Sequence, residues 1–307
     1  MAKLVSVSDA NFLDPSAYCE ELESGNILFF PTCPFEFPKK ELEFLLAQKQ
    51  TGSSHRKNIA YKPSSDKLTN FIHSSESQAN TLHQIMRSYS QKVTTLLSKI
   101  LAPYHSGWKL DYASFRPFQE RGRNLRVRAR NDLLHTDAFP SRPMHGSRIL
   151  RFFTNINPTE SRQWITSDPF HELAKCFGGT DVAFPKGISG SLSEKLMSLS
   201  KKMGRTVGLP LPLRSPYDSF MLNLHNFLKE NEAFQKNCHK DYWNFPPNSC
   251  WMVYTDLVSH AATAGQYALE QTLIIPKETM VHPEKAPIST LERLTSQKMV
   301  NPFFCQR

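Results

Sequence analysis

The sequence predicts a mainly β domain with flanking helices, an α+β fold. Three observations support this prediction. Segments typical of strands follow one another from residue 108 to 158, and further strand-like segments return at 250–276. A helix with one apolar face precedes the first group. A long stretch of turns and helical patterns, 168–249, separates the two groups. We therefore expect one β core with a helical insertion.

The composition is that of a globular protein with an anionic partner. The chain has 307 residues, 39% of them hydrophobic, and a net charge of +9. A chain of this length can bury a sizeable core, and excess positive charge favours phosphate, carboxylate, nucleic acid or acidic lipid. A basic solvated surface is the alternative interpretation.

The sequence carries no sign of secretion or of a membrane span. The six cysteines include no C-x-x-C pair, and the N-terminal segment lacks the apolar stretch of a signal peptide. No apolar run is long enough to cross a bilayer. We therefore expect reduced thiols and a cytoplasmic location.

Residues 1–107 are expected to support the core with helices. In the segment 79–101, ANTLHQIMRSYSQKVTTLLSKIL, apolar residues recur three and four positions apart, which gives a helix one apolar face. Pro103 is expected to end this helix, because proline cannot continue it. The apolar face consists of Leu82, Ile85, Met86, Tyr89, Val93, Leu96, Leu97 and Ile100.

Residues 108–276 carry the strand patterns of the core. The segment 125–130, LRVRAR, alternates strictly, so a strand there would turn its three apolar residues one way and its three arginines the other. An Asn-Pro turn ends the strand that follows. The other strands are expected at 108–118, 148–158, 250–263 and 267–276, the last two as a pair.

The insertion and the tail complete a chain that we expect to form a single domain, 1–307. Within the insertion, 168–249, a lysine-bearing helix is expected at 193–203 and an amphipathic helix at 219–234. The tail, 277–307, is polar and is expected to lie on the outside.

Two H-x-D motifs could each supply two ligands of a metal site. A mononuclear Fe(II) oxygenase needs two histidines and one carboxylate on one face of the metal. Residues two apart on a strand point the same way, so His135 and Asp137 could present both ligands at a strand end. His260, after the apolar segment CWMVY, is the expected third ligand. His239 and Asp241 lie in a polar segment too close in sequence to His260, and we interpret them as surface residues.

The order of these motifs resembles that of the Fe(II)/2-oxoglutarate-dependent dioxygenases. HTD at 135–137, RILRFFTNINP at 148–158 and a histidine after WMVY carry the resemblance, which covers residues 108–276. It implies a double-stranded β-helix core, also called a jelly roll or cupin-like fold. The arginine-rich segment before HTD and the helical insertion are most similar to the bacterial Kdo 3-hydroxylases, where Kdo is 3-deoxy-D-manno-oct-2-ulosonic acid.

The resemblance implies a reaction and its cofactors. The expected activity is hydroxylation at C3 of the outer Kdo sugar of lipopolysaccharide and lipid A precursors, which gives Ko, with succinate and CO2 as co-products. His135, Asp137 and His260 would bind Fe(II) and carry the catalysis, with 2-oxoglutarate as co-substrate and O2 as oxidant. A buried strand histidine without a metal is the alternative for His260 taken alone.

At the position expected to bind the far carboxylate of 2-oxoglutarate, this sequence departs from the common pattern. Many members of the superfamily place an arginine or lysine on the last strand, but residues 266–271 contain no base. Arg151 would face inward with Phe153, whereas Arg148 would face outward. A buried arginine needs an anion, so we expect Arg151 to bind this carboxylate. Its pairing with an internal acid such as Glu270 is the alternative. The residues expected at the co-substrate are Arg151, Asn155, Gln266 and Gln271.

Basic residues beside the metal motif are candidates for binding the acidic sugar and its phosphates. Guanidinium groups suit both carboxylates and phosphates. The alternative is a solvated edge strand that charge protects from aggregation. The run 121–130 contains Arg121, Arg123, Arg126, Arg128 and Arg130, and we expect the last three, with Arg142 and His145 of the following loop, to contact the substrate.

The expected partners are a Kdo-containing lipid A precursor and the anionic inner face of the bacterial inner membrane, which the basic helix at 193–203 would touch peripherally. We expect no nucleic acid, because no stacking platform lies beside a basic groove. Two other hypotheses remain: an oxygenase of the same core that acts on protein or nucleic acid, and a metal-free jelly roll that binds an anionic surface. The sequence leaves the oligomeric state open.

Overall fold

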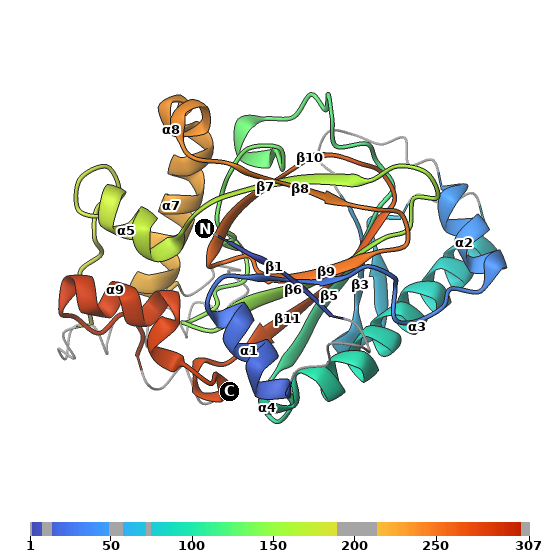
Figure 1. The fold of residues 1–307 in the computed structure, drawn as a ribbon, viewed down its shortest axis with the longest axis horizontal. Helices are drawn as coiled ribbons and strands as arrows, with labels where there is room; N and C mark the ends of the chain where they lie inside the picture. The colour runs from blue at the N-terminus through green and yellow to red at the C-terminus, as the bar shows by residue number, and fades with distance from the viewer. Residues whose placement is uncertain (1, 8–13, 49–57, 72–74, 189–213, 302–307) are drawn as a thin grey trace, which may run out of the picture.

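Two antiparallel sheets face each other and form the core of the chain (Figure 1). The computed structural model describes residues 2–7, 14–48, 58–71, 75–188 and 214–301. The large sheet has eight strands in these residues, and only its first pair is parallel. Its order is β1 (Leu4–Ser6), β2 (Ile27–Phe30), β9 (Cys250–Tyr254), β6 (Arg148–Asn155), β11 (Ala268–Ile275), β5 (Lys109–Arg116), β3 (Ile59–Lys62) and β4 (Lys67–Thr69).

The smaller sheet contains β10 (Val258–Ala264), β7 (Arg162–Pro169) and β8 (Asp241–Phe245), in that order. His135 extends it, because a backbone bridge joins this residue to His260 on β10. The two facing sheets confirm the predicted mainly β core with flanking helices and its jelly-roll form.

Aromatic rings join the two sheets at one end of the core. The ring of Trp251 on β9 stacks on Phe245 of β8 at 4.0 Å and on Phe153 of β6 at 5.1 Å between centroids. Trp164 of β7 meets Phe153 edge-on at 4.8 Å. All four side chains are buried. Because Phe153 and Trp164 also line the cavity between the sheets, this aromatic cluster gives the cavity a rigid floor.

Helices cover the outer side of the large sheet and one end of the core (Figure 1). The predicted amphipathic helix is confirmed: α3 buries one face against the sheet and ends at Ile100, and Pro103 opens the short helix that follows. Ser75 caps the first turn of α3 by accepting a hydrogen bond from Gln78 N. The described helices are α1 (Pro15–Glu23), α2 (Lys39–Leu46), α3 (Glu76–Ile100), α4 (Ala102–His105), α5 (Phe170–Phe177), α7 (Pro216–Glu230), α8 (Glu232–Asn237) and α9 (Pro287–Thr295).

The predicted strand at 125–130 is wrong. These residues form an exposed segment with a single 3-10 turn at Val127–Ala129, and the Val127 side chain remains 44% exposed. Alternation alone does not make a strand, which needs a neighbour for its backbone groups and a surface on which to bury its apolar face. The three arginines therefore do not form one row on a sheet.

Other strand boundaries also differ from the predictions. The sequence predicted two strands, at 250–263 and 267–276, but the structure has three. A turn after Tyr254 separates β9 from β10, and β10 belongs to the smaller sheet. Strands β7 and β8 were not predicted; they border the insertion, which therefore runs from Phe170 to Lys240. The described residues of 1–107 supply the strands β1, β2, β3 and β4 of the large sheet besides their helices.

The insertion is tied to the segment that follows the HTD motif. Asp218 completes a capping box with Ser215 at the start of α7, and its Oδ1 accepts hydrogen bonds from Met144 N and His145 N. Helix α7 confirms the amphipathic helix predicted at 219–234 as far as Glu230, where the extended residue Asn231 ends it and α8 begins. The lysine-bearing helix predicted at 193–203 lies outside the described residues.

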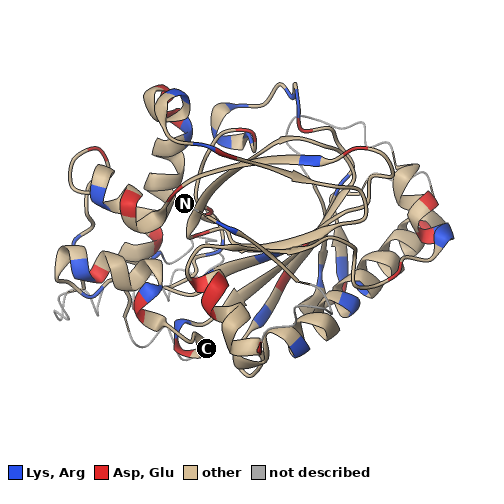
Figure 2. Cartoon of the chain, in the orientation of Figure 1, with Lys and Arg blue, Asp and Glu red and all other residues tan. Residues whose placement is uncertain are grey.

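The C-terminal tail, which the sequence predicted to be polar and external, also buries apolar side chains. Helix α9 buries Ile288 and Leu291, and the chain beyond it buries Met299 and Val300. In the part of the chain that the structure describes, acidic and basic residues are mixed over most helices (Figure 2).

A fully buried ion pair lies on the outer side of the large sheet. Arg148 points away from the cavity, as predicted, and its guanidinium donates to Asp256 at 2.8 and 3.1 Å. Removing one partner would leave an uncompensated buried charge. We expect Arg148→Met to lower the free energy of unfolding by about 3–5 kcal/mol. Thermal and denaturant unfolding would measure the loss, and Lys39→Met, at an exposed pair with Glu43, should change little. An equally small effect at Arg148 would contradict the prediction.

Candidate metal centre

The backbone brings the two halves of the site together. His135 N donates to His260 O at 3.1 Å, and His260 N donates to His135 O at 2.9 Å. Asp137 N donates to Thr255 O at 2.7 Å. Because alternate residues of an extended chain point the same way, His135 and Asp137 both face the cavity beside His260.

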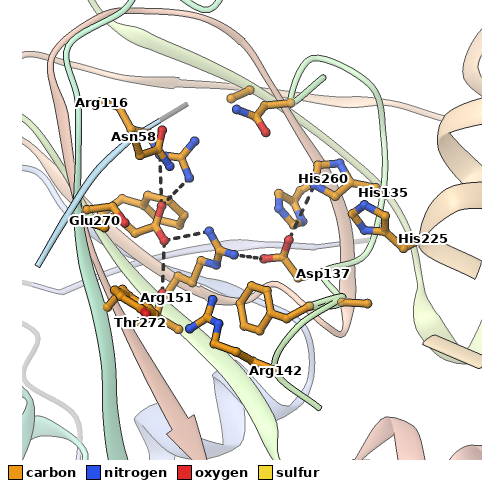
Figure 3. Close-up of a pocket in the computed structure, with 18 of the residues that line it drawn as sticks. Asn58, Arg116, His135, Asp137, Arg142, Arg151, His225, His260, Glu270 and Thr272 are labelled. Atoms are coloured by element: carbon orange, nitrogen blue, oxygen red, sulfur yellow. Dashed lines mark hydrogen bonds and ion pairs between the residues drawn. The ribbon is translucent and has the colours of Figure 1, made fainter. Parts of the chain in front are cut away.

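The three side chains converge as the sequence predicted. One ligand atom from each of His135, Asp137 and His260 lies within 4.8 Å of the other two, and all three residues are buried (Figure 3). The His135 Nε2 lies 3.7 Å from Asp137 Oδ1. No other such group of three or more His, Cys, Asp or Glu residues occurs in the described parts of the chain.

Backbone carbonyls orient both imidazoles. The Nδ1 of His135 lies 2.7 Å from Leu133 O, and the Nδ1 of His260 lies 2.9 Å from Val258 O. Each Nδ1 therefore carries the proton, which leaves the Nε2 lone pair for the cavity. The ring of Trp164 stacks on His260 at 5.2 Å and limits its rotation.

The charges at neutral pH suit a divalent cation. Burial lowers the pKa of His135 well below its usual value, and it also lowers the pKa of His260. Burial would raise the pKa of Asp137, but Arg151 and neighbouring groups outweigh it and hold the pKa at about 2. The site thus offers two neutral imidazoles and one carboxylate.

The donor set fits a ferrous ion bound by two histidines and one carboxylate. Within the described residues, neither Nε2 takes part in a hydrogen bond, although both rings are buried. Both rings line the cavity, and Asp137 Oδ2 is a buried oxygen without a hydrogen-bond partner. Such an atom is costly, and a metal bound on the open side of the three residues would satisfy it.

The three side chains stand in a cavity of about 660 Å³ with a basic lining (Figure 3). The carboxylates that line it are Asp137 and Glu270. The basic residues that line it are Arg116, Arg128, Arg142, Arg151, Arg162 and Lys229. Because cations outnumber carboxylates in a partly dry space, the cavity favours anionic ligands.

Arg151 enters the cavity, but carboxylates already surround it. Its Nη1 donates to Glu270 Oε1 at 2.7 Å, which is the alternative weighed from the sequence, and its Nη2 lies 2.8 Å from Asp137 Oδ2. The other expected co-substrate residues do not line the cavity. Asn155 and Gln266 donate to backbone carbonyls at the end of the core, and Gln271 faces the other side of β11.

The arginines beside the metal motif take separate positions. Arg128 lines the cavity rim and pairs with Glu230, whereas Arg130 pairs with Asp132 outside the lining. Arg126 is exposed and has no ion pair within the described residues. These positions follow from the loop that replaces the predicted strand.

The two substrate-binding residues expected in the loop after HTD, Arg142 and His145, take different positions relative to the cavity. Arg142 lines the cavity, forms an ion pair with Asp111 and lies over the rings of Tyr112 and Phe139. Burial and the nearby Arg151 lower its pKa to about 10. His145 lies outside the lining, against Asp218 at 3.3 Å. The structure thus brings Arg142, but not His145, to the cavity.

The second H-x-D motif is a local surface pair. His239 Nε2 lies 2.8 Å from Asp241 Oδ1, and the histidine side chain is 54% exposed. No third ligand lies beside them in the part of the chain described, in agreement with the sequence interpretation.

Several residues of the cavity were missed from the sequence. Arg116 shares a face of β5 with Ser114 and Tyr112, so the alternation of WKLDYASFR could have indicated it. Arg162 and Trp164 were missed because β7 was missed. His225 and Lys229 come from α7; the His225 Nδ1 lies 2.7 Å from Thr136 O, inside the HTD motif. One helix face of the insertion therefore reaches the metal centre.

Comparisons with known proteins agree with this arrangement. Residues 10–298 match the family model described as 3-deoxy-D-manno-oct-2-ulosonic acid (Kdo) hydroxylase. No curated protein matches the sequence significantly.

Solved structures of one enzyme resemble the whole chain. A crystal structure of the Kdo hydroxylase KdoO, a non-heme Fe(II) α-ketoglutarate-dependent dioxygenase, with α-ketoglutarate and Fe(III), is 32% identical, covers 97% of each chain and has a TM-score of 0.81. Its cobalt(II) complex is 32% identical, covers 97% of this chain and 98% of that one, and has a TM-score of 0.82. The succinate and Fe(III) complex is 31% identical with the same coverage and a TM-score of 0.80.

Proposed function

The chain belongs to the 3-deoxy-D-manno-oct-2-ulosonic acid (Kdo) hydroxylase family, and from that premise we propose that it is an Fe(II)/2-oxoglutarate-dependent dioxygenase that hydroxylates a Kdo sugar. The observation that carries the proposal is the convergence of His135, Asp137 and His260 in a buried, basic cavity. Two neutral imidazoles and one carboxylate leave a bound ferrous ion with positive charge and open positions for a keto acid and O2.

The iron ligands are His135 Nε2, His260 Nε2 and an oxygen of Asp137. When bound, the iron supplies O2 activation coupled to the oxidation of 2-oxoglutarate to succinate and CO2. The chain itself fixes both imidazoles through their Nδ1–H bonds to backbone carbonyls, and Trp164 holds the His260 ring from its face. The aromatic cluster keeps water from the floor of the cavity.

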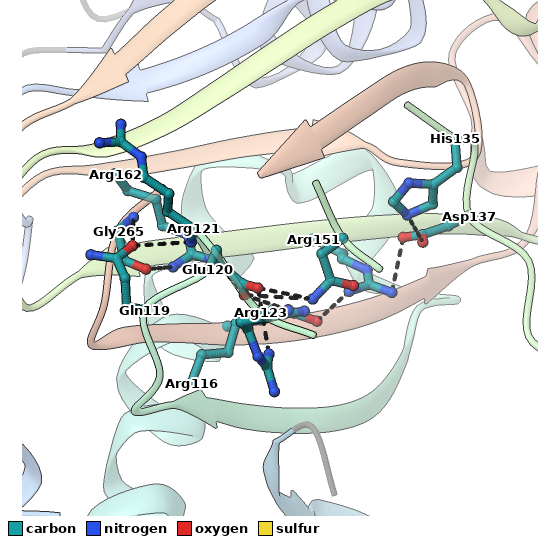
Figure 4. A network of polar contacts seen from close by, with 12 residues as sticks. Arg116, Gln119, Glu120, Arg121, Arg123, His135, Asp137, Arg151, Arg162 and Gly265 are labelled. Carbon is teal, nitrogen blue, oxygen red and sulfur yellow. Dashed lines mark hydrogen bonds and ion pairs between the residues drawn. The ribbon is translucent and has the colours of Figure 1, made fainter. Parts of the chain in front are cut away.

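We assign the far carboxylate of 2-oxoglutarate to Arg116 of β5 and Arg162 of β7. Both line the same cavity as Arg151, and both are buried (Figure 4). Burial and the nearby Arg116 lower the pKa of Arg162, which favours an additional anion beside the two guanidinium groups. The Arg162 Nε is buried without a hydrogen-bond partner, and the Arg116 Nη1 has only Glu120 at 3.7 Å.

The sugar acid would enter from the rim, where three cations remain. Arg142 lies beside the metal centre, and Arg128 and Lys229 lie on the side of the insertion. Hydroxylation at C3 of the outer Kdo, which gives Ko, requires the neighbouring carboxylate of the sugar to lie near the iron. Arg142 is our choice for that carboxylate, because its lowered pKa reflects burial beside another cation. Arg128 and Lys229 would take phosphates of the lipid A precursor.

The location at the membrane is a further part of the proposal. Among the residues that the structure describes, none of the helices is both long and apolar enough to cross a bilayer. We propose a cytoplasmic enzyme that touches the anionic inner face of the inner membrane peripherally, where a Kdo-containing lipid A precursor is presented. The excess of basic over acidic residues supports this contact.

Incubation of the purified protein with Fe(II), 2-oxoglutarate, O2 and a Kdo-bearing lipid A precursor tests the function. We expect the product to gain one oxygen atom by mass spectrometry and succinate to form in equal amount. A reaction without 2-oxoglutarate is the control. Succinate formation without a change in the mass of this substrate would indicate an oxygenase that acts on another substrate. If neither succinate nor the oxygenated product formed, the proposed activity would be rejected.

A further inference from the structure

Two cysteines that are far apart in the sequence meet at the start of β9. Cys250 is the first residue of this strand, where it pairs with Phe30 of β2 on one side and with Thr154 of β6 on the other. Cys33 lies in the loop after β2, and its N–H donates to Asn248 O at 2.6 Å. This contact holds the loop against the start of β9, and the two thiols are in hydrogen-bond contact.

The two thiols differ in exposure. Cys250 is fully buried, and its Sγ lies 3.4 Å from the hydroxyl oxygen of Thr154. Cys33 is half-buried and lines a second cavity of about 450 Å³, which shares no lining residue with the cavity of the metal centre. A small molecule in this second cavity therefore meets Cys33 before it meets Cys250.

The surroundings of Cys33 favour its thiolate. The hydrogen bond with Cys250 lowers the pKa of the Cys33 thiol, and the backbone of Phe35 and the ammonium group of Lys92 add to this effect and outweigh burial. Burial instead raises the pKa of Cys250 well above its usual value. Because the thiolate is the nucleophile, Cys33 is the reactive member of the pair and Cys250 stays protonated.

We propose that Cys33 and Cys250 form a dithiol site that hydrogen peroxide oxidises reversibly to a disulfide. The Cys33 thiolate attacks one peroxide oxygen, the O–O bond breaks, and hydroxide leaves and takes up a proton to become water. The Cys250 sulfur then attacks the sulfur of the resulting sulfenic acid. The S–S bond forms, the S–O bond breaks, and a second water leaves with the Cys250 proton. The two thiols lose two electrons, which the peroxide takes up.

The site is separate from the proposed hydroxylation. The two thiols lie at the start of β9, whereas Thr255, just beyond the other end of the strand, accepts the hydrogen bond from Asp137 N. In the reducing cytosol, disulfides of this kind are transient and report on oxidants. A second thiol beside the reactive one stops oxidation at the disulfide, which reductants reverse, before an irreversible sulfinic acid forms.

The test is peptide mapping of the reduced full chain after treatment with a small excess of hydrogen peroxide and alkylation of the remaining thiols. A chelator keeps free iron out of the reaction. We expect a pair of peptides joined through Cys33 and Cys250, two hydrogen masses lighter than the separate peptides, which dithiothreitol splits again. The bond links residues distant in sequence and restricts the unfolded chain, so the melting temperature of the oxidised chain should rise by about 5 °C.

Two substitutions separate the pair from a single reactive thiol. Cys33→Ser should abolish both the joined peptides and the shift in melting temperature. Cys250→Ala removes the hydrogen bond that lowers the pKa of Cys33, so iodoacetamide should alkylate Cys33 several-fold more slowly at pH 7. In this variant peroxide should also carry Cys33 on to the sulfinic acid, because no second thiol intercepts the sulfenic acid.

The matched control is Cys238→Ser. Cys238 is half-buried like Cys33 but does not line the second cavity, so the joined peptides should form as in the unaltered chain. Full alkylation of both Cys33 and Cys250 after peroxide, or a bond from Cys33 to another cysteine, would overturn the inference. A lower melting temperature of the oxidised chain would also overturn it, since the bond would then strain the native packing. If Cys250→Ala does not fold, the unaltered chain and Cys33→Ser decide the question.

Discussion

His260→Ala is expected to abolish hydroxylation and to remove most of the metal affinity. This residue supplies one of the two Nε2 atoms at the centre, and among the described residues no histidine or cysteine beyond His135 and His260 belongs to this ligand group. A catalytic metal contributes several kcal/mol to transition-state stabilisation, and each 1.4 kcal/mol is about tenfold in rate, so turnover should fall by about 10³-fold or more. Succinate formation and iron content per chain would both be measured.

The second H-x-D motif provides a control for this substitution. His239→Ala removes a histidine from the same sequence pattern, but that side chain is exposed and pairs only with Asp241 in the described structure. Iron content and turnover should stay unchanged. Circular dichroism would show that both variants fold. Full iron content in folded His260→Ala would reject the assignment of this histidine as a ligand.

Arg116→Lys is expected to raise the KM for 2-oxoglutarate by about 10–100-fold, with a smaller change in kcat. A hydrogen bond to a charged group contributes about 1.5–3 kcal/mol, and lysine cannot reproduce the two-pronged contact of a guanidinium. The substitution keeps a positive charge beside Glu270 and Glu120, so the fold should survive. Arg162→Lys should act in the same direction, because its side chain is buried and lines the same cavity.

A substitution at a neighbouring arginine distinguishes an effect on co-substrate binding from a general effect of replacing an arginine that pairs with Glu120. Arg123 forms an ion pair with Glu120, as Arg116 does, but it does not line the cavity. Arg123→Lys should therefore leave the KM for 2-oxoglutarate unchanged. The assignment would be wrong if Arg116→Lys and Arg162→Lys both behaved like this control while Arg151→Lys raised the KM.

Where the signal is local, the sequence predicted the molecule well. The apolar face of α3 follows from spacing along one helix, β5 from alternation along one segment, and β6 and β11 from strand-like segments, the first of them ended by an Asn-Pro turn. His135 and Asp137 face the same way because they stand two apart on extended backbone. These properties depend on residues close to one another in the sequence, so they can be predicted before the fold is known.

Non-local signals were harder to interpret. LRVRAR alternates as a strand should, yet it lacks a partner strand and stays exposed. Strands β7 and β8, which border the insertion, were not recognised, and Arg162 and Trp164 were missed with β7. Alternation states which residues share a face but not whether a neighbouring strand exists to pair with them.

The amino-acid sequence by itself predicted the three candidate ligands and the outward direction of Arg148, because these depend on local backbone geometry and on the order of motifs. The jelly-roll form of the core followed from the resemblance of those motifs to a known family. Only the tertiary structure decided that Arg151 meets Glu270 and Asp137, that Arg116 and Arg162 line the cavity, and that His145 does not line it. The partners of a buried charge come from strands distant in sequence, and the energy of each pairing depends on the surroundings that the complete fold creates.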